Sequence, residues 1–155
     1  MVLYRVIWFL AGLLFGGVAV QYKNRKEFFR EKKRKYHMSL LENSITDLNR
    51  KDLMPYFTDH GYKSIIVYGM GYYFRSFMDM IDIDQLNVYY ADKNADPDNN
   101  IYSPLQIANI NADVIVITAI TYFDEIHKEL TEKHFEKREI VSFQDIVFYV
   151  SKENV

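Results

Sequence analysis

The N-terminal part of the chain is marked by one long apolar stretch. Val6–Val20 contains no charged side chain, and the stretch extends to Met1 if Arg5 snorkels toward an interface. A membrane-spanning helix needs about 20 predominantly apolar residues. The pattern therefore predicts a transmembrane helix over residues 1–22. Aromatic side chains at its two ends are suited to be interface anchors, namely Tyr4, Trp8 and Tyr22.

Residues 23–60 are expected to form a basic juxtamembrane segment followed by stalk helices. A short helix is predicted around Tyr56 and Phe57, ending at Gly61. Upstream of it, apolar residues recur at a helical spacing of three, four and three, which gives a stripe suited to pack on the body or on a partner: Met38, Leu41, Ile45 and Leu48.

Residues 61–150 show a different pattern, in which short apolar runs alternate with amphipathic helical segments. Four runs are typical of strands: Ser64–Tyr68, Leu86–Ala91, Asp113–Thr118 and Glu139–Ser142. The third has Val-Ile-Val-Ile at its centre, as in a strand that is buried on both faces. Strands alternating with helices imply an α/β fold with a parallel sheet of about four strands, flanked by helices on right-handed crossovers.

The helices predicted between these strands have apolar faces and start signals. The helix over 71–82 would bury Phe74, Phe77, Met78 and Ile81, and the helix after Thr121 would bury Phe123, Ile126, His127 and Leu130. A last helical turn contains Ile146, Val147 and Tyr149, before a tail over 151–155. Three pairs match a capping signal: Ser103 with Gln106, Thr121 with Asp124, and Ser142 with Asp145.

The charge is distributed unevenly along the chain. Met1–His37 carries nine Lys and Arg against two Glu, a net charge of +7, whereas Met38–Val155 carries ten against nineteen, a net charge of −9. Basic residues directly after an apolar span resist export, so the C-terminal body is expected in the cytoplasm of a single-pass protein. The cluster Lys23–Lys35 is also suited to anionic lipid. The acidic body argues against nucleic acid as a partner, and the absence of cysteine excludes disulfides and thiolate metal sites.

The first strand of the body runs directly into a Gly-Met-Gly turn at Gly69–Gly71, and the second ends at an acid, Asp92. This is the layout of the first β-α-β unit of a Rossmann-type nucleotide site. The third strand is expected beside the first, opposite the second, so that a crevice opens where the order of the strands reverses. The predicted binding residues are those of the turn, the helix start, the acid and the facing strand end: Gly69, Met70, Gly71, Tyr72, Asp92 and Thr118.

The glycine pattern is incomplete, which leaves a second interpretation open. The third glycine of Gly-x-Gly-x-x-Gly would fall at Phe74, where a phenyl ring must push the helix outward or repack it. Two-glycine turns also occur in α/β folds that bind nothing. A purely structural turn is therefore the alternative to a nucleotide site.

No catalytic or metal-ligating group is indicated by the spacing of the remaining residues. Asp92–Ser103 copies a calcium loop only superficially, because Pro97 stands where glycine is needed and Ser103 where glutamate is needed. Tyr89-x-x-x-Lys93 matches the Tyr/Lys spacing of short-chain dehydrogenases, but it straddles a strand end. His127 has Asp124 one turn away, and two ligands alone do not make a metal site.

Several short blocks of sequence between Leu53 and Val150 match those of a known family: Tyr62-Lys63, Val67-Tyr68-Gly69-Met70-Gly71, Asp92-Lys93-Asn94, Tyr102-Ser103-Pro104, Val114–Ile120 and Tyr122–Ile126. Through these blocks the chain resembles a Rossmann-like domain common in bacterial surface-polysaccharide loci. It is also similar to the nucleotide-sugar-binding N-terminal domains of sugar acyltransferases and to the nucleotide-binding domains of related epimerases.

Taken together, the apolar N-terminal stretch, the glycine turn and this resemblance lead us to expect a membrane-anchored cytoplasmic module that binds a nucleotide-sugar or an NAD-type dinucleotide. Such a module would be accessory or regulatory to glycan-synthesis enzymes rather than an enzyme itself. Two alternatives remain open at this point. One is a degenerate scaffold that binds only proteins, through the stalk or the aromatic surface of Tyr72, Tyr73 and Phe74. The other is a fragment of an NAD-dependent oxidoreductase or epimerase, although the body lacks a second domain for a substrate.

Overall fold

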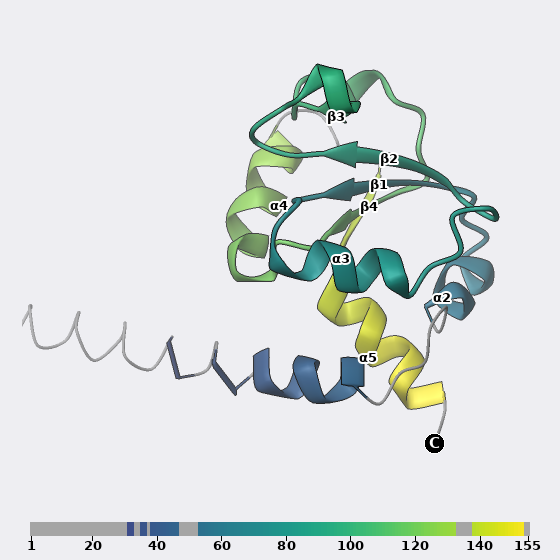
Figure 1. Ribbon diagram of the computed structural model, residues 1–155, viewed down its shortest axis with the longest axis vertical. Helices are drawn as coiled ribbons and strands as arrows, with labels where there is room; N and C mark the ends of the chain where they lie inside the picture. Colours follow the sequence, from purple (N-terminus) through teal and green to yellow (C-terminus); the bar gives the residue numbers. More distant parts are fainter. Residues whose placement is uncertain (1–30, 33–34, 37, 47–52, 133–137, 154–155) are drawn as a thin grey trace, which may run out of the picture. The chain divides into compact units, whose positions relative to one another are not determined.

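The computed structural model describes residues 31–32, 35–36, 38–46, 53–132 and 138–153 (Figure 1). The chain divides into two compact units, Met1–Leu40 and Leu41–Val155, and the sheet belongs to the second. The predicted transmembrane helix over residues 1–22 lies outside the described residues, as does most of the basic segment. Within the described part of the chain, no helix is both long enough and apolar enough to cross a membrane.

The second unit is built on one parallel sheet of five strands, in the order β3-β2-β1-β4-β5. All the pairings between neighbouring strands are parallel. The strands are β1 (Ser64–Tyr68), β2 (Asn87–Ala91), β3 (Ile101–Tyr102), β4 (Val114–Ile117) and β5 (Glu139–Ser142). The four predicted strands are confirmed, and β2 and β4 lie on opposite sides of β1 as expected.

The prediction of about four strands missed β3, an edge strand of only two residues. Ile101 and Tyr102 pair with Tyr90 and Ala91 of β2, and they lie in a segment to which the sequence pattern assigned no strand. Two residues are too few to show a period-two pattern in the sequence, so this strand is defined by its pairing with β2 alone.

Among the described residues, the α-helices that accompany the sheet are α2 (Met54–Asp59), α3 (Tyr72–Asp79), α4 (Phe123–Glu132) and α5 (Phe143–Glu153). Short 3₁₀ turns complete the order of elements, η1 (Pro97–Asn99), η2 (Gln106–Asn109) and η3 (Ile120–Tyr122). Residues 41–46 are also helical. The sequence placed the end of α3 three residues too late and reduced α5 to one turn, whereas α5 runs for 11 residues and takes in the first part of the predicted tail.

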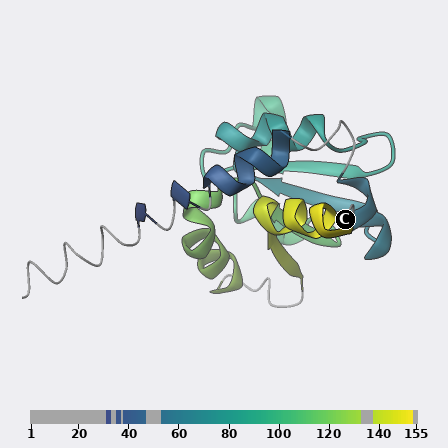
Figure 2. The same cartoon turned by 90° about the horizontal axis from the view of Figure 1, so that it is seen from below.

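The two faces of the sheet have separate cores because side chains alternate along each strand. On one face, Ile66 and Ile115 pack with Leu130 of α4 and Ile107 of η2. The other face is covered by aromatic rings of α2, α3 and α5. Phe77 lies 6.3 Å from Phe57 and 5.5 Å from Phe143, measured between ring centroids. In both views α4 lies apart from α5 (Figures 1 and 2).

The buried face of α3 contains Tyr73 where Phe74 was predicted. Tyr73 and Phe77 are buried, and Phe74 is only partly buried. The reason is the start of the helix. Tyr72 is the first helical residue, and this phase directs Tyr73 toward Phe143 of α5, at 6.2 Å between ring centroids. A stripe inferred from apolar spacing alone cannot distinguish two adjacent aromatic residues.

Two of the three predicted capping signals are confirmed. The Ser142 hydroxyl donates to the Asp145 carboxylate at 2.7 Å and accepts from the backbone N–H of Asp145 at 3.0 Å. Ser103 and Gln106 form the reciprocal bonds of a capping box, although the box opens the 3₁₀ turn η2 rather than an α-helix. The predicted cap at Thr121 is wrong, because Thr121 lies inside η3 and the helix begins directly after that turn.

Candidate functional site

The turn after β1 is held by the ends of both neighbouring strands. The backbone N–H of Gly69 donates to the carbonyl of Ala91 at 2.8 Å, and the carbonyl of Gly69 accepts from the hydroxyl of Thr118. Gly69 has φ = +100°, and a Cβ added to it would lie 2.9 Å from the Cβ of Ala119. Gly69 is therefore required both by its backbone conformation and by the close approach of the segment after β4.

Thr118 was predicted to face the ligand crevice, and the structure brings it against Gly69 instead. Its side chain is 1% exposed. Besides its bond to Gly69, its backbone N–H donates to the carbonyl of Tyr68 at 3.0 Å. These contacts give Thr118 the role of joining the ends of β1 and β4. Any effect of Thr118 on a ligand would act through the position of the turn.

The second glycine of the turn is open to solvent. Gly71 is the N-cap of α3, with φ = −84°, and no side chain caps the helix. A Cβ added at Gly71 would have no heavy atom within 4 Å. The first N–H groups of a helix have no acceptor within the helix. The backbone at Gly71, Tyr72 and Tyr73 is therefore positioned to bind an anion, because the helix dipole also favours negative charge at this end.

Phe74, which stands at the third glycine of the pattern, is repacked away from the turn. Its ring lies 5.9 Å from the ring of Tyr90 in β2, at an interplanar angle of 76°. The side chain is partly buried over the sheet. The phenyl ring thus extends toward β2 and leaves the space over Gly71 empty. The incomplete glycine pattern does not by itself block this end of α3.

Asp92 lies beside the turn, 22 residues along the chain from Met70. One oxygen of its carboxylate accepts the N–H of Met70 at 2.8 Å, and the other accepts the N–H of Asn94 at 2.9 Å. Asp92 therefore fixes the turn to the loop after β2. The amide of Met70, one of the predicted binding residues, is thereby already bonded within the protein, as is the amide of Gly69, which donates to the carbonyl of Ala91. Each carboxylate oxygen retains a lone pair for a further donor.

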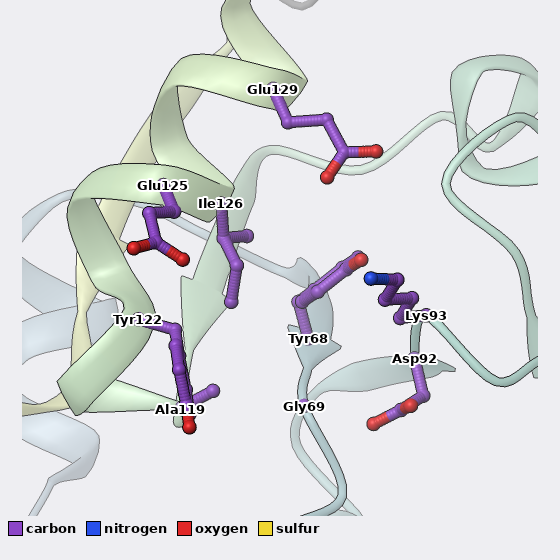
Figure 3. Close-up of a pocket in the computed structure, with 9 residues that line it drawn as sticks. All are labelled: Tyr68, Gly69, Asp92, Lys93, Ala119, Tyr122, Glu125, Ile126 and Glu129. Carbon is purple, nitrogen blue, oxygen red and sulfur yellow. The ribbon is translucent and has the colours of Figure 1, made fainter.

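A cavity of about 350 Å³ opens on the other side of Gly69, between α4 and the loop after β2 (Figure 3). Two of the predicted residues, Gly69 and Asp92, contribute to its wall. The rest of the wall was not indicated by the sequence pattern, and it consists of Tyr68, Lys93, Ala119, Tyr122, Glu125, Ile126 and Glu129. Glu125, Ile126 and Glu129 lie at helical spacing along α4, and of these three only Ile126 belongs to the apolar stripe that predicted the helix.

The cavity carries more negative than positive groups. Asp92, Glu125 and Glu129 contribute carboxylates, and Lys93 contributes one ammonium group. Figure 3 shows Glu125 and Glu129 on the α4 side and Lys93 on the opposite side, with Tyr68 between them. Burial, together with the negative charges of Glu129 and Asp92, raises the pKa of Tyr68 to about 12. The hydroxyl of Tyr68 is therefore protonated at neutral pH and can donate a hydrogen bond.

The geometry gives the site two parts with different chemistry. The open end of α3 is suited to a phosphate, and the cavity is suited to a ring with hydroxyl or amino donors. In the part of the chain that the structure describes, no group of three or more His, Asp or Glu side chains is placed to hold a metal ion.

The order of the strands reverses between β1 and β4, and the glycine turn lies at the carboxyl end of β1. These features define a Rossmann-like α/β domain with its candidate site at the switch point. Residues 61–141 match the model of a family described as C2185-like, N-terminal. The match covers more than half of the chain, so the protein belongs to this family. No curated protein and no solved structure gives a significant match to the chain.

Proposed function

We propose that the protein is a nucleotide-binding module whose ligand lies across the carboxyl ends of β1 and β4. The observation that carries the proposal is the N-terminus of α3 at Gly71, which no side chain caps and no neighbouring atom covers. The cavity adjoins the same turn at Gly69. A nucleotide-sugar or an NAD-type dinucleotide has a pyrophosphate between two ring systems, and such a ligand matches an anion site that adjoins a cavity.

The division of charge supports a defined orientation of this ligand. A pyrophosphate is favoured at the amides of Tyr72 and Tyr73, and it is disfavoured near Glu125 and Glu129 of the cavity. One ring of the ligand would then occupy the cavity, with its hydroxyl groups within reach of Asp92. In this arrangement Thr118 keeps the turn in place without touching the ligand, and Gly69 forms part of the cavity wall beside the ring.

A second candidate function is a scaffold that binds only proteins. It is favoured by the hydrogen bonds that already engage the amides of Gly69 and Met70. Two of the turn's donors are thereby satisfied within the protein. The exposed side chain of Tyr72 would then belong to a protein-binding surface. The open backbone at Gly71 has no role in this alternative.

The two candidates are separated by ligand-induced stabilisation. Thermal unfolding of the full-length protein in mild detergent should be measured with NAD, NADP, ADP, UDP-glucose and UDP-glucuronate. A nucleotide present at 100 times its Kd is expected to add about 2.7 kcal/mol to the free energy of unfolding. If every nucleotide leaves the melting temperature unchanged at millimolar concentration, the nucleotide proposal is wrong and the scaffold is favoured.

The cellular setting is part of the same proposal. The apolar stretch over residues 1–22 and the basic cluster Lys23–Lys35 support a single-pass anchor with the α/β domain in the cytoplasm. The resemblance to domains of surface-polysaccharide loci supports a role accessory to glycan-synthesis enzymes. These partners would use the nucleotide-sugars that the site is proposed to bind.

The anchor is tested by fractionation. The full-length protein is expected to stay in the membrane pellet through a wash with alkaline carbonate, because a transmembrane helix is held by burial of apolar side chains. A matched variant with Leu10, Leu13 and Leu14 replaced by lysine should be released or fail to enter the membrane. Release of the parent protein by carbonate would show that residues 1–22 do not span the bilayer.

A further inference from the structure

Tyr68 places a phenol hydroxyl in the wall of the cavity. It is the last residue of β1, it directly precedes Gly69, and it is 3% exposed. Figure 3 shows its hydroxyl end in the cavity, between the side chains of Glu129 and Lys93. Among the hydrogen bonds of the described residues, none is made by this hydroxyl. A buried ring that carries an unused donor into a cavity points to a group that the protein itself does not supply.

We propose that Tyr68 and Glu129 bind an uncharged, hydroxyl-bearing ring of the nucleotide ligand, either a ribose or a hexose, and exclude rings that carry a phosphate or a carboxylate. This inference rests on the proposed function and names the part of the ligand that enters the cavity. Tyr68 donates to a ring oxygen or hydroxyl, and Glu129 accepts from a second hydroxyl. The two side chains come from β1 and α4, so they contact the ring from different elements.

The charge of the cavity supplies the selectivity. Three carboxylates, those of Asp92, Glu125 and Glu129, face one ammonium group, that of Lys93. Hydroxyl groups are good donors to carboxylates, whereas an anionic substituent would bring a like charge into a partly desolvated space. Asp92 is already bonded to two backbone amides. The glutamates of α4 add two further carboxylates to that of Asp92 in the cavity wall.

Tyr68 is suited to this role by its protonation state as well as by its position. Burial and the neighbouring charges of Glu129 and Asp92 raise the pKa of Tyr68 to about 12. The side chain thus remains a donor over the whole physiological range. A phenolate would be repelled by the same carboxylates and could only accept hydrogen bonds. The site combines a hydroxyl donor with carboxylate acceptors, which matches the two-way hydrogen bonding of sugar hydroxyls.

The test uses two pairs of ligands that differ in one charged group. NAD and NADP differ by a phosphate on a ribose, and UDP-glucose and UDP-glucuronate differ by a carboxylate on a hexose. Calorimetric titration of the full-length protein in mild detergent should show at least roughly 10-fold tighter binding of the uncharged member in one pair. The pair that shows this preference identifies the ring, ribose or hexose, that occupies the cavity.

Two variants and two controls assign the preference to residues. Tyr68→Phe removes only the hydroxyl and should raise the Kd of the preferred ligand by roughly 3- to 10-fold. Glu129→Gln should reduce the ratio of the two Kd values, that of the charged ligand over that of the uncharged ligand, by a similar factor. The controls are Tyr89→Phe on β2 and Glu132→Gln on α4, whose side chains do not line the cavity. Both should bind the four ligands as the parent does.

Each outcome decides one proposal or both. If the parent binds both members of each pair equally, or if Tyr68→Phe and Glu129→Gln behave as the controls do, the inference is overturned and nucleotide binding stands. If no ligand binds the parent protein, the proposed function fails and the inference fails with it. Because the Tyr68 hydroxyl makes no hydrogen bond within the described residues, Tyr68→Phe should melt at the parent's temperature without ligand. A lower melting temperature with unchanged ligand preference would show a structural role and overturn the inference.

Discussion

Replacing Gly71 with valine is expected to abolish stabilisation by nucleotides while the protein still folds. Gly71 has φ = −84°, which valine adopts readily, and a Cβ there meets no heavy atom within 4 Å. The side chain would occupy the space where a phosphate approaches the first amides of α3. At 100 times its Kd, a nucleotide should add about 2.7 kcal/mol to the free energy of unfolding of the parent protein. The same nucleotide should not measurably change the free energy of unfolding of the variant.

The unliganded variant provides the control for this result. Valine is a poorer N-cap residue than glycine, so the free energy of unfolding should fall by no more than about 1 kcal/mol. The measurement is thermal unfolding of parent and variant, each with and without the best nucleotide. Equal stabilisation of both proteins would place the phosphate away from α3 and contradict the proposed orientation of the ligand.

Replacing Gly69 with alanine is expected to have the opposite consequence, a large loss of stability in the absence of any ligand. The positive φ of +100° is costly for a residue with a side chain, and the new Cβ would lie 2.9 Å from the Cβ of Ala119. Backbone strain of about 1–2 kcal/mol and overpacking of about 1–3 kcal/mol should together lower the free energy of unfolding by about 3 kcal/mol. Neither cost can be relieved by a side-chain rotation, because both contacting groups are methyl carbons.

Gly71→Ala is the matched control, since it makes the same chemical change two residues further along the turn. Chemical denaturation followed by far-ultraviolet circular dichroism should give a loss of under about 1 kcal/mol for this variant. A similar loss at both positions would show that the two glycines have the same structural role. The expected contrast would show that Gly69 is needed for folding stability, whereas Gly71 is needed for ligand binding.

The arrangement of the main strands could be predicted because it depends on local signals and general rules. Ile65, Ile66 and Val67 form a continuous apolar run, and so do Val114–Ile117, as in strands that are covered on both faces. The doubly wound order of a Rossmann-type unit, with right-handed crossovers, then places β2 and β4 on opposite sides of β1. The same rules locate the switch point, and the turn at Gly69–Gly71 lies there.

The length of the last helix and the face of α3 could not be obtained in this way. Phe143 begins α5, and its ring packs against both Tyr73 and Phe77 of α3. Contacts of this kind extend a helix beyond the part with a recognisable apolar stripe, because tertiary packing supplies most of the stability of a short helix. They also decide which of two adjacent aromatic residues is buried, here Tyr73 rather than Phe74.

The sequence by itself determined the parallel α/β fold, the order of its main strands and the edge of the sheet at which the glycine turn lies. These depend on residue type, apolar period and chain handedness, all of which can be observed over short distances along the chain. Only the tertiary structure decided that Asp92 bonds to Met70, that Phe74 packs on Tyr90, and that Glu129 and Tyr68 line one cavity. Each of these contacts joins residues from different elements, and such pairs meet only when the packing of the helices on the sheet sets their distance.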